Sequence, residues 1–389
     1  MRILFLSREY PPQTGWGGIG TFVSTIAPAL ARSGHDVHVL SCVDGQQQSD
    51  YLNRGVSVHR RDLIRLPGLQ RITQAPQFVS WLRTGLSTVV KSKSLGSFDA
   101  IDFPNNWAEG CAFGFLRKRY TVCTIHTLFQ QFFVPTTSST RRDLRWTNRL
   151  EQFTTEKAQV AVTSSSLMEQ KLRALGWLRK REVVIIPRPV DWQRWEHVPE
   201  ASKTPPTALF VGRIEPRKAP ELLVEAVQML RRELPNVKAV FAGGFRAGPD
   251  GRPQMFWANG KASILDGCDF LGHVADAEME ALLSKARVIV QPSALESFGL
   301  AAAEGMASGR PAIVTDTCGI ADFIRQAAGG DVVPHGDPCA LAAALKPYLC
   351  SPDLAKAVGT RAKNAVREQL DPDYIAARTE QLYERIHAA

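Results

Sequence analysis

This 389-residue sequence lacks several patterns that assign a protein to a class. Its seven cysteines are scattered without a Cys-x-x-Cys pair, which indicates neither a disulfide framework nor a zinc site. No apolar run reaches the roughly 20 residues of a membrane-spanning helix. The apolar stretch before Arg8 and Glu9 is too short for a signal peptide. We therefore expect a cytoplasmic protein.

Signals of redox-cofactor and metal chemistry are weak as well. The loop Gly17-Gly18-Ile19-Gly20 is interpreted as lacking the Gly-x-Gly-x-x-Gly spacing of the dinucleotide fingerprint, which disfavours an NAD(P)-dependent oxidoreductase. No Asp-x-Asp pair follows an expected strand, because Asp371-Pro372-Asp373 precedes the last helix and is typical of a helix cap. A catalytic divalent metal is not expected.

Positive charge is concentrated in the first half of the chain. Residues 1–200 hold 26 Lys and Arg against 16 Asp and Glu (+10), and residues 201–389 hold 21 against 22 (−1), which sum to the net +9. A basic face attracts phosphates, anionic lipid or nucleic acid, although a solvated surface explains any single cluster. Nucleic acid is disfavoured because no nucleic-acid-binding module is recognisable. The clusters are Arg60, Arg61, Arg65 and Arg71; Arg117, Lys118 and Arg119; Arg141, Arg142, Arg145 and Arg149; and Arg179, Lys180 and Arg181.

Short apolar runs alternate with helical patterns along both halves, which predicts an α/β fold with parallel sheets covered by helices. The length favours two domains, because it exceeds what one hydrophobic core organises. Strands are expected at 2–7, 35–41, 55–59, 98–103, 120–125, 159–163 and 183–186, and near 207–211, 237–242, 268–271, 287–291, 311–314 and 331–333.

The most informative segment lies in the second half and carries two glutamates. Residues 288–293 read as a buried strand that stops at a proline, and residues 300–307 read as a helix. Glu296 falls in the loop between them, and Glu304 falls about one turn into the helix. The free amides and the dipole of the helix start favour a phosphate-like anion. The pattern suits a nucleotide sugar, although a chance pair of surface glutamates also explains the spacing.

Three further segments stand in a characteristic order around this one. They are the strand 2–7 with Pro11-Pro12 and the loop Gly17-Gly18-Ile19-Gly20; the run 208–218, which holds Arg213 and Lys218; and Phe270-Leu271-Gly272-His273-Val274. With the two glutamates, they resemble the motifs of the retaining family-4 glycosyltransferases, which have the GT-B fold. The sequence departs from that family at Pro187-Arg188-Pro189, where Asn-Gly is common, and at Ala219, where Gly is usual.

The resemblance implies two facing Rossmann-like domains of the doubly wound type, with a cleft between them. The domain boundaries that we expect are 1–197 for an acceptor-binding domain, 198–206 for a proline-rich linker and 207–370 for a nucleotide-sugar-binding domain. Residues 371–389 are expected to form a helix that crosses back to the first domain.

The resemblance also implies roles for single residues. Arg213 and Lys218 would bind the donor diphosphate, while Arg217 is expected to point elsewhere. Glu296 would contact sugar hydroxyls, and Glu304 would bind the ribose. His126 follows an expected strand and would lie beside the transferred sugar. The catalytic set is therefore His126, Glu296, Arg213 and Lys218, and the donor-binding set is Gly17, Gly18, Arg213, Lys218, Glu296, Ser297, Phe298, Gly299, Leu300 and Glu304.

The residue types alone leave alternatives open. Arg213 and Lys218 could be ordinary surface residues on a loop, and His126 could have a structural role. The family retains anomeric configuration, and a front-face mechanism without a metal or a cofactor is implied. A covalent role of Glu296 stays open. The expected donor is a nucleotide-diphosphate sugar.

The expected function is hexosyl transfer to a hydroxyl acceptor in surface polysaccharide or glycolipid assembly. Aromatic residues at 128–135 precede Arg141 to Arg149, and such a stretch suits a lipid-linked or phosphorylated acceptor or peripheral contact with an anionic membrane. An ordinary loop over the core is the alternative. Within the class, the alternative is a soluble enzyme acting on a small molecule or sugar phosphate. Outside it, the alternative is a GT-B nucleotide-sugar epimerase.

Overall fold

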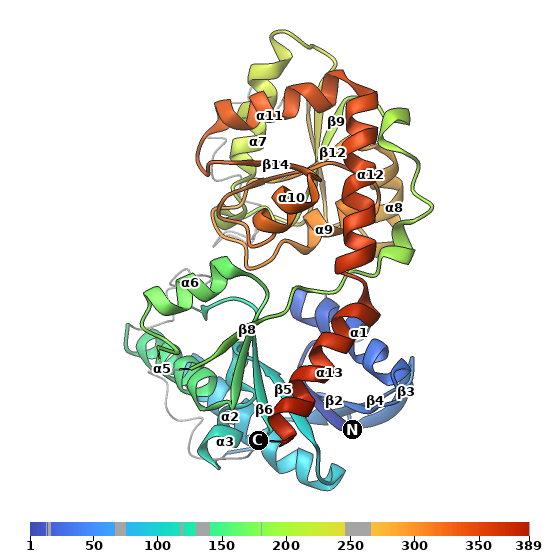
Figure 1. Cartoon of the computed structure of the whole chain (residues 1–389). Helices are drawn as coiled ribbons and strands as arrows, with labels where there is room; N and C mark the ends of the chain where they lie inside the picture. Colours follow the sequence, from blue (N-terminus) through green and yellow to red (C-terminus); the bar gives the residue numbers. More distant parts are fainter. Residues whose placement is uncertain are drawn as a thin grey trace. The chain divides into compact units, whose positions relative to one another are not determined.

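The computed structural model describes residues 1–12, 14, 17–66, 75–116, 120–129, 141–179, 181–245 and 266–388. The chain forms two compact units. The first consists of Met1–Pro189 and Pro372–Ala389, and the second consists of Val190–Asp371. Each unit is built on its own sheet (Figure 1), so the predicted α/β class with two Rossmann-like units is confirmed.

The sheet of the first unit has eight strands within the described residues, in the order β3-β4-β2-β1-β5-β6-β7-β8. Neighbours pair parallel except β3 and β4, which pair antiparallel. The bounds are β1 (Arg2–Leu6), β2 (Asp36–Val43), β3 (Ser49–Asn53), β4 (Val56–Asp62), β5 (Ala100–Pro104), β6 (Thr121–Ile125), β7 (Val160–Thr163) and β8 (Val183–Ile185).

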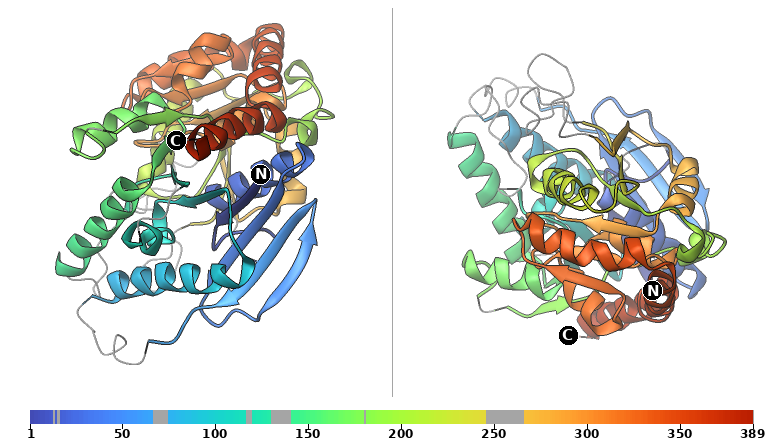
Figure 2. Two further views of the ribbon diagram at one scale, coloured as in Figure 1. Left: turned by 60° about the horizontal axis from the view of Figure 1, so that its bottom comes forward. Right: turned by 90° about the horizontal axis from the view of Figure 1, so that it is seen from above.

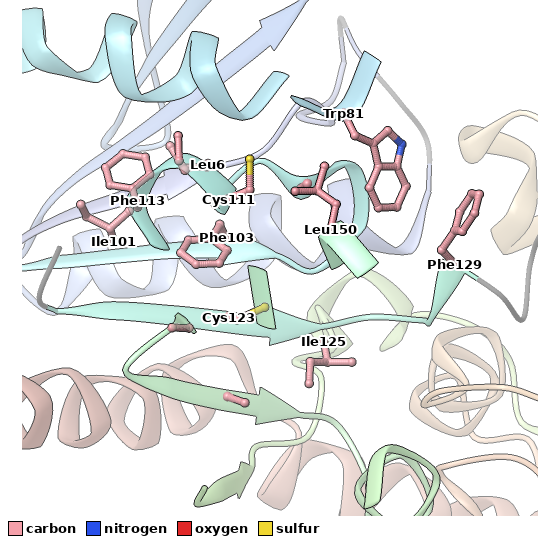
Figure 3. Packing of buried hydrophobic residues seen from close by; sticks show 14 of the residues in the cluster. Leu6, Trp81, Ile101, Phe103, Cys111, Phe113, Cys123, Ile125, Phe129 and Leu150 are labelled. Atoms are coloured by element: carbon pink, nitrogen blue, oxygen red, sulfur yellow. The ribbon is translucent and has the colours of Figure 1, made fainter. Parts of the chain in front are cut away.

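Alternating side chains of these strands build a core on each face of the sheet, because successive strand residues point to opposite sides. Ile3 and Phe5 pack against α1 and α13, while Leu4 and Leu6 pack against α2, α3 and α5. Figure 3 shows the core on the α2, α3 and α5 side of this sheet, where Phe103 of β5 lies near Cys111 of α3. The helices are α1 (Gly18–Arg32), α2 (Pro76–Ser92), α3 (Cys111–Phe115), α5 (Arg141–Lys157), α6 (Ser166–Ala174) and α13 (Pro372–Ala388), with short 3-10 turns η2 (Lys93–Leu95) and η3 (Asn106–Ala108).

The last helix, α13, belongs to the first unit although it ends the chain. It lies beside α1, as the red and blue helices show in Figures 1 and 2. Tyr383 Oη donates a hydrogen bond to Asp102 Oδ2 of β5 at 2.7 Å. The buried side chains of α13, which complete the core on that sheet face, are Ile375, Ala376, Thr379, Leu382, Tyr383 and Ile386.

The second unit has a six-stranded sheet within the described residues, in the order β11-β10-β9-β12-β13-β14, and all pairs are parallel. The strands are β9 (Thr207–Val211), β10 (Lys238–Ala242), β11 (Cys268–Gly272), β12 (Val288–Gln291), β13 (Ala312–Thr315) and β14 (Gly330–Val333). The helices are α7 (Pro220–Arg231), α8 (Met279–Lys285), α9 (Leu300–Ala307), α10 (Ala321–Ala327), α11 (Pro338–Cys350) and α12 (Pro352–Gln369), with 3-10 turns η4 (Trp192–Trp195), η5 (Ala201–Lys203), η6 (Pro216–Lys218) and η8 (Asp276–Glu278).

The stretch 198–206, predicted to be a linker, lies inside the second unit. Val198 and Ala201 are buried in the cores of that unit. The amide of Val190 donates to the carbonyl of Leu370 at 2.8 Å, which ties the start of the unit to its end. Burial of these two apolar side chains stabilises the stretch as part of the second unit. The change of unit therefore comes earlier, after Pro189.

Candidate active site

In each sheet the strand order reverses between two neighbouring parallel strands. In the second unit the reversal lies between β9 and β12, and in the first it lies between β1 and β5. Ligands of open parallel sheets bind outside the carboxyl ends of the strands at such a switch point. The loop after β9 carries Arg213, Arg217 and Lys218, and the loop after β12 carries Glu296. The sheet order therefore brings these loops together.

Glu296 is the centre of the polar contacts at the β9–β12 switch point. Its side chain is 15% exposed and forms an ion pair with Lys218, the ammonium of which contacts Oε2. Arg217 Nη1 lies 3.5 Å from the same oxygen. Burial raises the pKa of Glu296, but the charges of Lys218 and Arg217 outweigh it and hold the pKa below its ordinary value. Glu296 is therefore ionised at neutral pH.

Arg217 lies beside Glu296, although the sequence analysis expected it to point elsewhere. Its Nη2 donates to Glu215 Oε1 at 2.8 Å, and its Nη1 donates to the carbonyl of Leu295 at 2.9 Å. Its own carbonyl accepts from the amide of Ala294 at 2.9 Å. The expectation was wrong because these contacts reach the Glu296 loop, which is distant in sequence.

Arg213 and Lys218 have different surroundings, although both are predicted donor ligands. The side chain of Arg213 is 66% exposed, and its Nη2 lies 3.5 Å from Glu215 Oε1. That of Lys218 is only 13% exposed and is held by Glu296. The guanidinium of Arg213 is thus largely available to a ligand, while the ammonium of Lys218 already has a carboxylate partner.

The segment from Ser297 to Glu304 has the predicted loop-to-helix form, with α9 beginning at Leu300. Gly299 has a φ of +123°, and a Cβ there would lie 2.8 Å from Ile320 Cγ2. Only glycine fits this turn without strain. Phe298 is buried in the core, while Ser297, Leu300 and Glu304 are partly exposed.

Gln291 is a further polar residue at this place that sequence interpretation missed. It is the last residue of β12 and is buried. Its Nε2 lies 3.5 Å from Glu296 Oε2, while its buried Oε1 has no partner within the described residues. The sequence feature that could have pointed to Gln291 is its polar side chain directly after the apolar run Val288-Ile289-Val290.

The glycine loop of the first unit is arranged differently from the prediction. Gly17 caps α1, which begins at Gly18. The amide of Gly20 donates to Glu9 Oε2 at 3.2 Å, and a Cβ on Gly17 would lie 2.7 Å from that oxygen. Glycines 15, 17 and 20 do have the Gly-x-Gly-x-x-Gly spacing that the interpretation set aside. A carboxylate at the start of α1 opposes a pyrophosphate there by charge repulsion, and Trp16 lies outside the described residues.

His126 follows β6 at the carboxyl edge of the first sheet. Its amide donates to Asn105 Oδ1 at 2.9 Å, and its ring packs edge-on against Phe22 at 5.3 Å between centroids. Burial, and then the charge of Arg188, hold the pKa of His126 well below its ordinary value. The imidazole is therefore neutral.

Arg188 was missed as a functional candidate. It lies over the Phe22 ring at 4.4 Å, and its Nη2 donates to the carbonyl of Ile125 at 2.8 Å. The signal was its place in Pro187-Arg188-Pro189, where the sequence departs from the family pattern. This placement puts a cation near the His126 segment.

The basic clusters do not all form an exposed face. Arg60 and Arg61 are buried: Arg60 donates to the carbonyl of Tyr10, and Arg61 pairs with Asp50. Arg71, Arg117, Lys118, Arg119 and Lys180 lie outside the described residues, as does most of 128–135. The exposed arginines of α5 are Arg141, Arg142, Arg145 and Arg149.

The described residues offer neither a cluster of metal ligands nor a membrane-spanning helix. Among those residues, no group of three or more His, Cys, Asp or Glu side chains is placed to hold a metal ion. None of the described helices combines the length and apolar character needed to cross a membrane.

Cations and an ionised carboxylate thus meet at the switch point of a doubly wound unit, a combination that suits a ligand with phosphates and hydroxyls. Two known families match the chain. The family described as Glycosyltransferase Family 4 matches residues 16–194, and the family described as Glycosyl transferases group 1 matches residues 193–365. The chain belongs to the family-4 glycosyltransferases of the GT-B fold. It is a nucleotide-sugar glycosyltransferase.

Individual relatives extend over most of the chain. A glycogen synthase from Mycobacterium tuberculosis is 27% identical over 411 residues, covering 98% of this chain and 94% of that protein. A D-inositol 3-phosphate glycosyltransferase from Kineococcus radiotolerans is 27% identical over 379 residues, covering 90% and 87%. The structure of a sucrose-phosphate synthase from Thermosynechococcus elongatus superposes with a TM-score of 0.79 at 23% identity, covering 100% and 99%, which shows a shared fold.

Proposed function

We propose that this protein transfers a hexosyl group from a nucleotide-diphosphate sugar to a hydroxyl acceptor, with retention of anomeric configuration and without a metal or a cofactor. The observation that carries the proposal is the pairing of Lys218 and Arg217 with an ionised Glu296 at the β9–β12 switch point. Glycosyl transfer needs cations for the leaving diphosphate and carboxylates for sugar hydroxyls, and this place offers both.

The proposed roles follow from that need. Arg213 and Lys218 bind the diphosphate, since Arg213 is exposed and Lys218 lies five residues away across the turn. Glu296 binds sugar hydroxyls near the reacting carbon, and Glu304 binds the ribose hydroxyls. Neutral His126 donates a hydrogen bond to the transferred sugar. The remaining donor ligands are proposed to be backbone groups: those of Ser297, Phe298, Gly299 and Leu300 for the sugar and phosphate, and those of Gly17 and Gly18 for the transferred sugar, because Glu9 disfavours a phosphate beside them.

For the acceptor, we propose a lipid-linked or phosphorylated hydroxyl compound used in surface polysaccharide or glycolipid assembly. The support is the exposed row of arginines on α5, where Arg142 also lies over the Trp146 ring at 5.6 Å. Such a basic and aromatic helix face suits peripheral contact with anionic lipid at the inner membrane face.

The second candidate is a soluble enzyme that glycosylates a small molecule or sugar phosphate. The relative named for D-inositol 3-phosphate supports it. Flotation with vesicles of phosphatidylglycerol, compared with phosphatidylcholine vesicles, separates the two candidates. Binding to the anionic vesicles that falls in an Arg142→Ala, Arg145→Ala double variant supports the first.

Donor identity is tested by thermal unfolding in the presence of UDP-, GDP- and ADP-sugars, because a ligand that binds only the folded state raises its stability. The donor that raises the melting temperature is then incubated with the protein, with and without acceptors, in EDTA. NMR of the product shows whether the anomeric configuration is kept. Conversion of the donor sugar to an isomer without an acceptor would instead identify an epimerase, and no effect of any donor would contradict the proposal.

A further inference from the structure

Two cations share one oxygen of Glu296. The Lys218 ammonium and Arg217 Nη1 both approach Oε2, and the Gln291 amide lies 3.5 Å from it. In the described part of the chain, no partner of Oε1 is recorded, which leaves that oxygen to a ligand hydroxyl. The arrangement gives Glu296 more positive charge than one ion pair requires.

The Lys218 ammonium cannot keep its full ion pair with Glu296 and bind a diphosphate equally strongly at the same time. Its ammonium is a compact charge on a flexible stem, and a bound donor would place about two negative charges beside it. As Lys218 turns toward the phosphates, its attraction for Glu296 weakens with distance. A buried carboxylate that loses its cation takes up a proton, and the neutral carboxyl is a weaker hydrogen-bond acceptor for a sugar hydroxyl than the carboxylate.

Arg217 has more contacts to hold its position than Lys218, whose ammonium is paired with Glu296 alone among the ion pairs of the described residues. Besides Glu296, its side chain is tied to Glu215 at 2.8 Å and to the Leu295 carbonyl at 2.9 Å. Its backbone carbonyl accepts from the Ala294 amide. The side chain is only 14% exposed. A guanidinium bound on three sides keeps its position while the neighbouring ammonium changes partner.

We propose that Arg217 is a positioning residue that keeps Glu296 ionised and in place when Lys218 turns to the donor diphosphate. The inference rests on the proposed function, because it needs a donor diphosphate at Lys218. It assigns to Arg217 a task that neither Arg213 nor Lys218 performs. Arg213 contacts Glu215, on the far side of Arg217 from Glu296.

The other groups that face Glu296 cannot replace Arg217. Gln291 is an uncharged amide from β12. Cys318, from the segment after β13, has a thiol with its pKa raised to about 11 by burial, so it carries no charge at neutral pH. Glu215 is an acidic residue and supplies no cation, and Arg217 contacts both it and Glu296. Among the described neighbours, Arg217 is thus the cation that remains when Lys218 leaves.

The test compares Arg217→Met with Arg217→Lys and with Arg325→Met, which removes an exposed arginine of α10 in the same unit. The readout is kcat and KM for the donor, measured as slow donor hydrolysis or as transfer, between pH 4.5 and 9. Removing the guanidinium raises the pKa of Glu296. The acid limb of the pH profile, where activity is lost as the pH falls, is therefore expected to lie at a higher pH in Arg217→Met than in the wild type.

For Arg217→Met at pH 7 we expect kcat to fall roughly 10- to 100-fold with a donor KM within about threefold. Arg217→Lys should restore the wild-type acid limb but not the full kcat, because lysine cannot bridge Glu215 and Leu295 together. Arg325→Met should match wild type throughout.

Two outcomes overturn the proposal in distinguishable ways. An active wild type with an unchanged acid limb and kcat in Arg217→Met refutes the role of Arg217 alone. A wild type that binds no nucleotide sugar refutes the proposed function and this inference with it. If Arg217→Met fails to fold, Arg217→Lys decides, since wild-type kcat in that variant also refutes the role.

Discussion

Buried carboxylates in the two units are kept in opposite charge states. In the second unit, Glu296 is ionised because Lys218 and Arg217 contact it. In the first unit, burial raises the pKa of Glu109 and of Glu151 to about 8, although backbone amides donate to both. The comparison shows that burial keeps Glu109 and Glu151 protonated at neutral pH, and that the paired cations hold the charge of Glu296.

The largest expected effect separates these two kinds of glutamate. Glu296→Gln removes a charge that the site maintains, so we expect kcat/KM to fall roughly 100- to 1,000-fold. Glu151→Gln replaces a group that is already neutral at pH 7, so its kcat/KM should stay within a few-fold of wild type. Steady-state kinetics of both variants at pH 7 provides the measurement. An equal loss in the two variants would remove the distinction between the units.

A second pair of variants compares a buried hydrogen bond with a partly buried one of the same type. Tyr383 of α13 donates to buried Asp102 at 2.7 Å, and Tyr348 of α11 donates to exposed Asp331 at 2.5 Å. Tyr383→Phe leaves the buried Asp102 Oδ2 without this donor, although Thr124 still donates to Oδ1, and the loss costs about 1–3 kcal/mol of unfolding free energy. Water replaces the lost donor in Tyr348→Phe, so its cost should be smaller. Urea unfolding measures both, and a larger loss for Tyr348→Phe would contradict the burial argument.

The smallest expected effect is a change in how stability depends on pH. Between pH 6.5 and 8 the folded state holds protons on Glu109 and Glu151 that the unfolded chain has released, because the folded pKa values are raised. Stability should therefore fall as the pH rises through this window. His126 and His59, whose pKa values are lowered, favour the folded state as pH rises only up to about 6.5.

The double variant Glu109→Gln, Glu151→Gln should flatten the fall between pH 6.5 and 8. Urea midpoints at four pH values measure it, with Glu296→Gln as the matched control. The pKa of the wild-type Glu296 carboxyl is lowered in the folded state. The stability that its charge contributes is therefore lost only below about pH 4.5, outside the window measured. A slope that persists in the double variant would assign the titration to other groups.

Local patterns in the sequence were enough to predict the strands that carry the site. The alternation of apolar runs predicted the strands around Glu296, and Gly299 with Leu300 marked the start of α9. The edge strand β3 was missed, because Asp50 and its neighbours are polar and exposed and show no buried face. Edge strands pair on one side only and need no apolar run.

Side-chain partners could not be predicted in the same way. The burial of Arg60 depends on Tyr10, Thr14 and Tyr51, which lie on other segments. Arg217 likewise depends on Leu295, which is 78 positions away. Contacts of this kind are decided by the order of strands in the sheet, and a local pattern carries no information about them. For that reason the sequence allowed candidate residues to be chosen, but not the partners of their side chains.

The position of α13 has a consequence for how the protein is made on the ribosome. The second unit is one continuous stretch, so all of its residues are made before α13 is made. The core of the first unit, by contrast, includes Ile375 to Ile386 and is complete only after the whole second unit has been synthesised. Until α13 emerges, the apolar side chains of α1 that it contacts lack these partners. The unit with the earlier residues is therefore the unit that completes its core later.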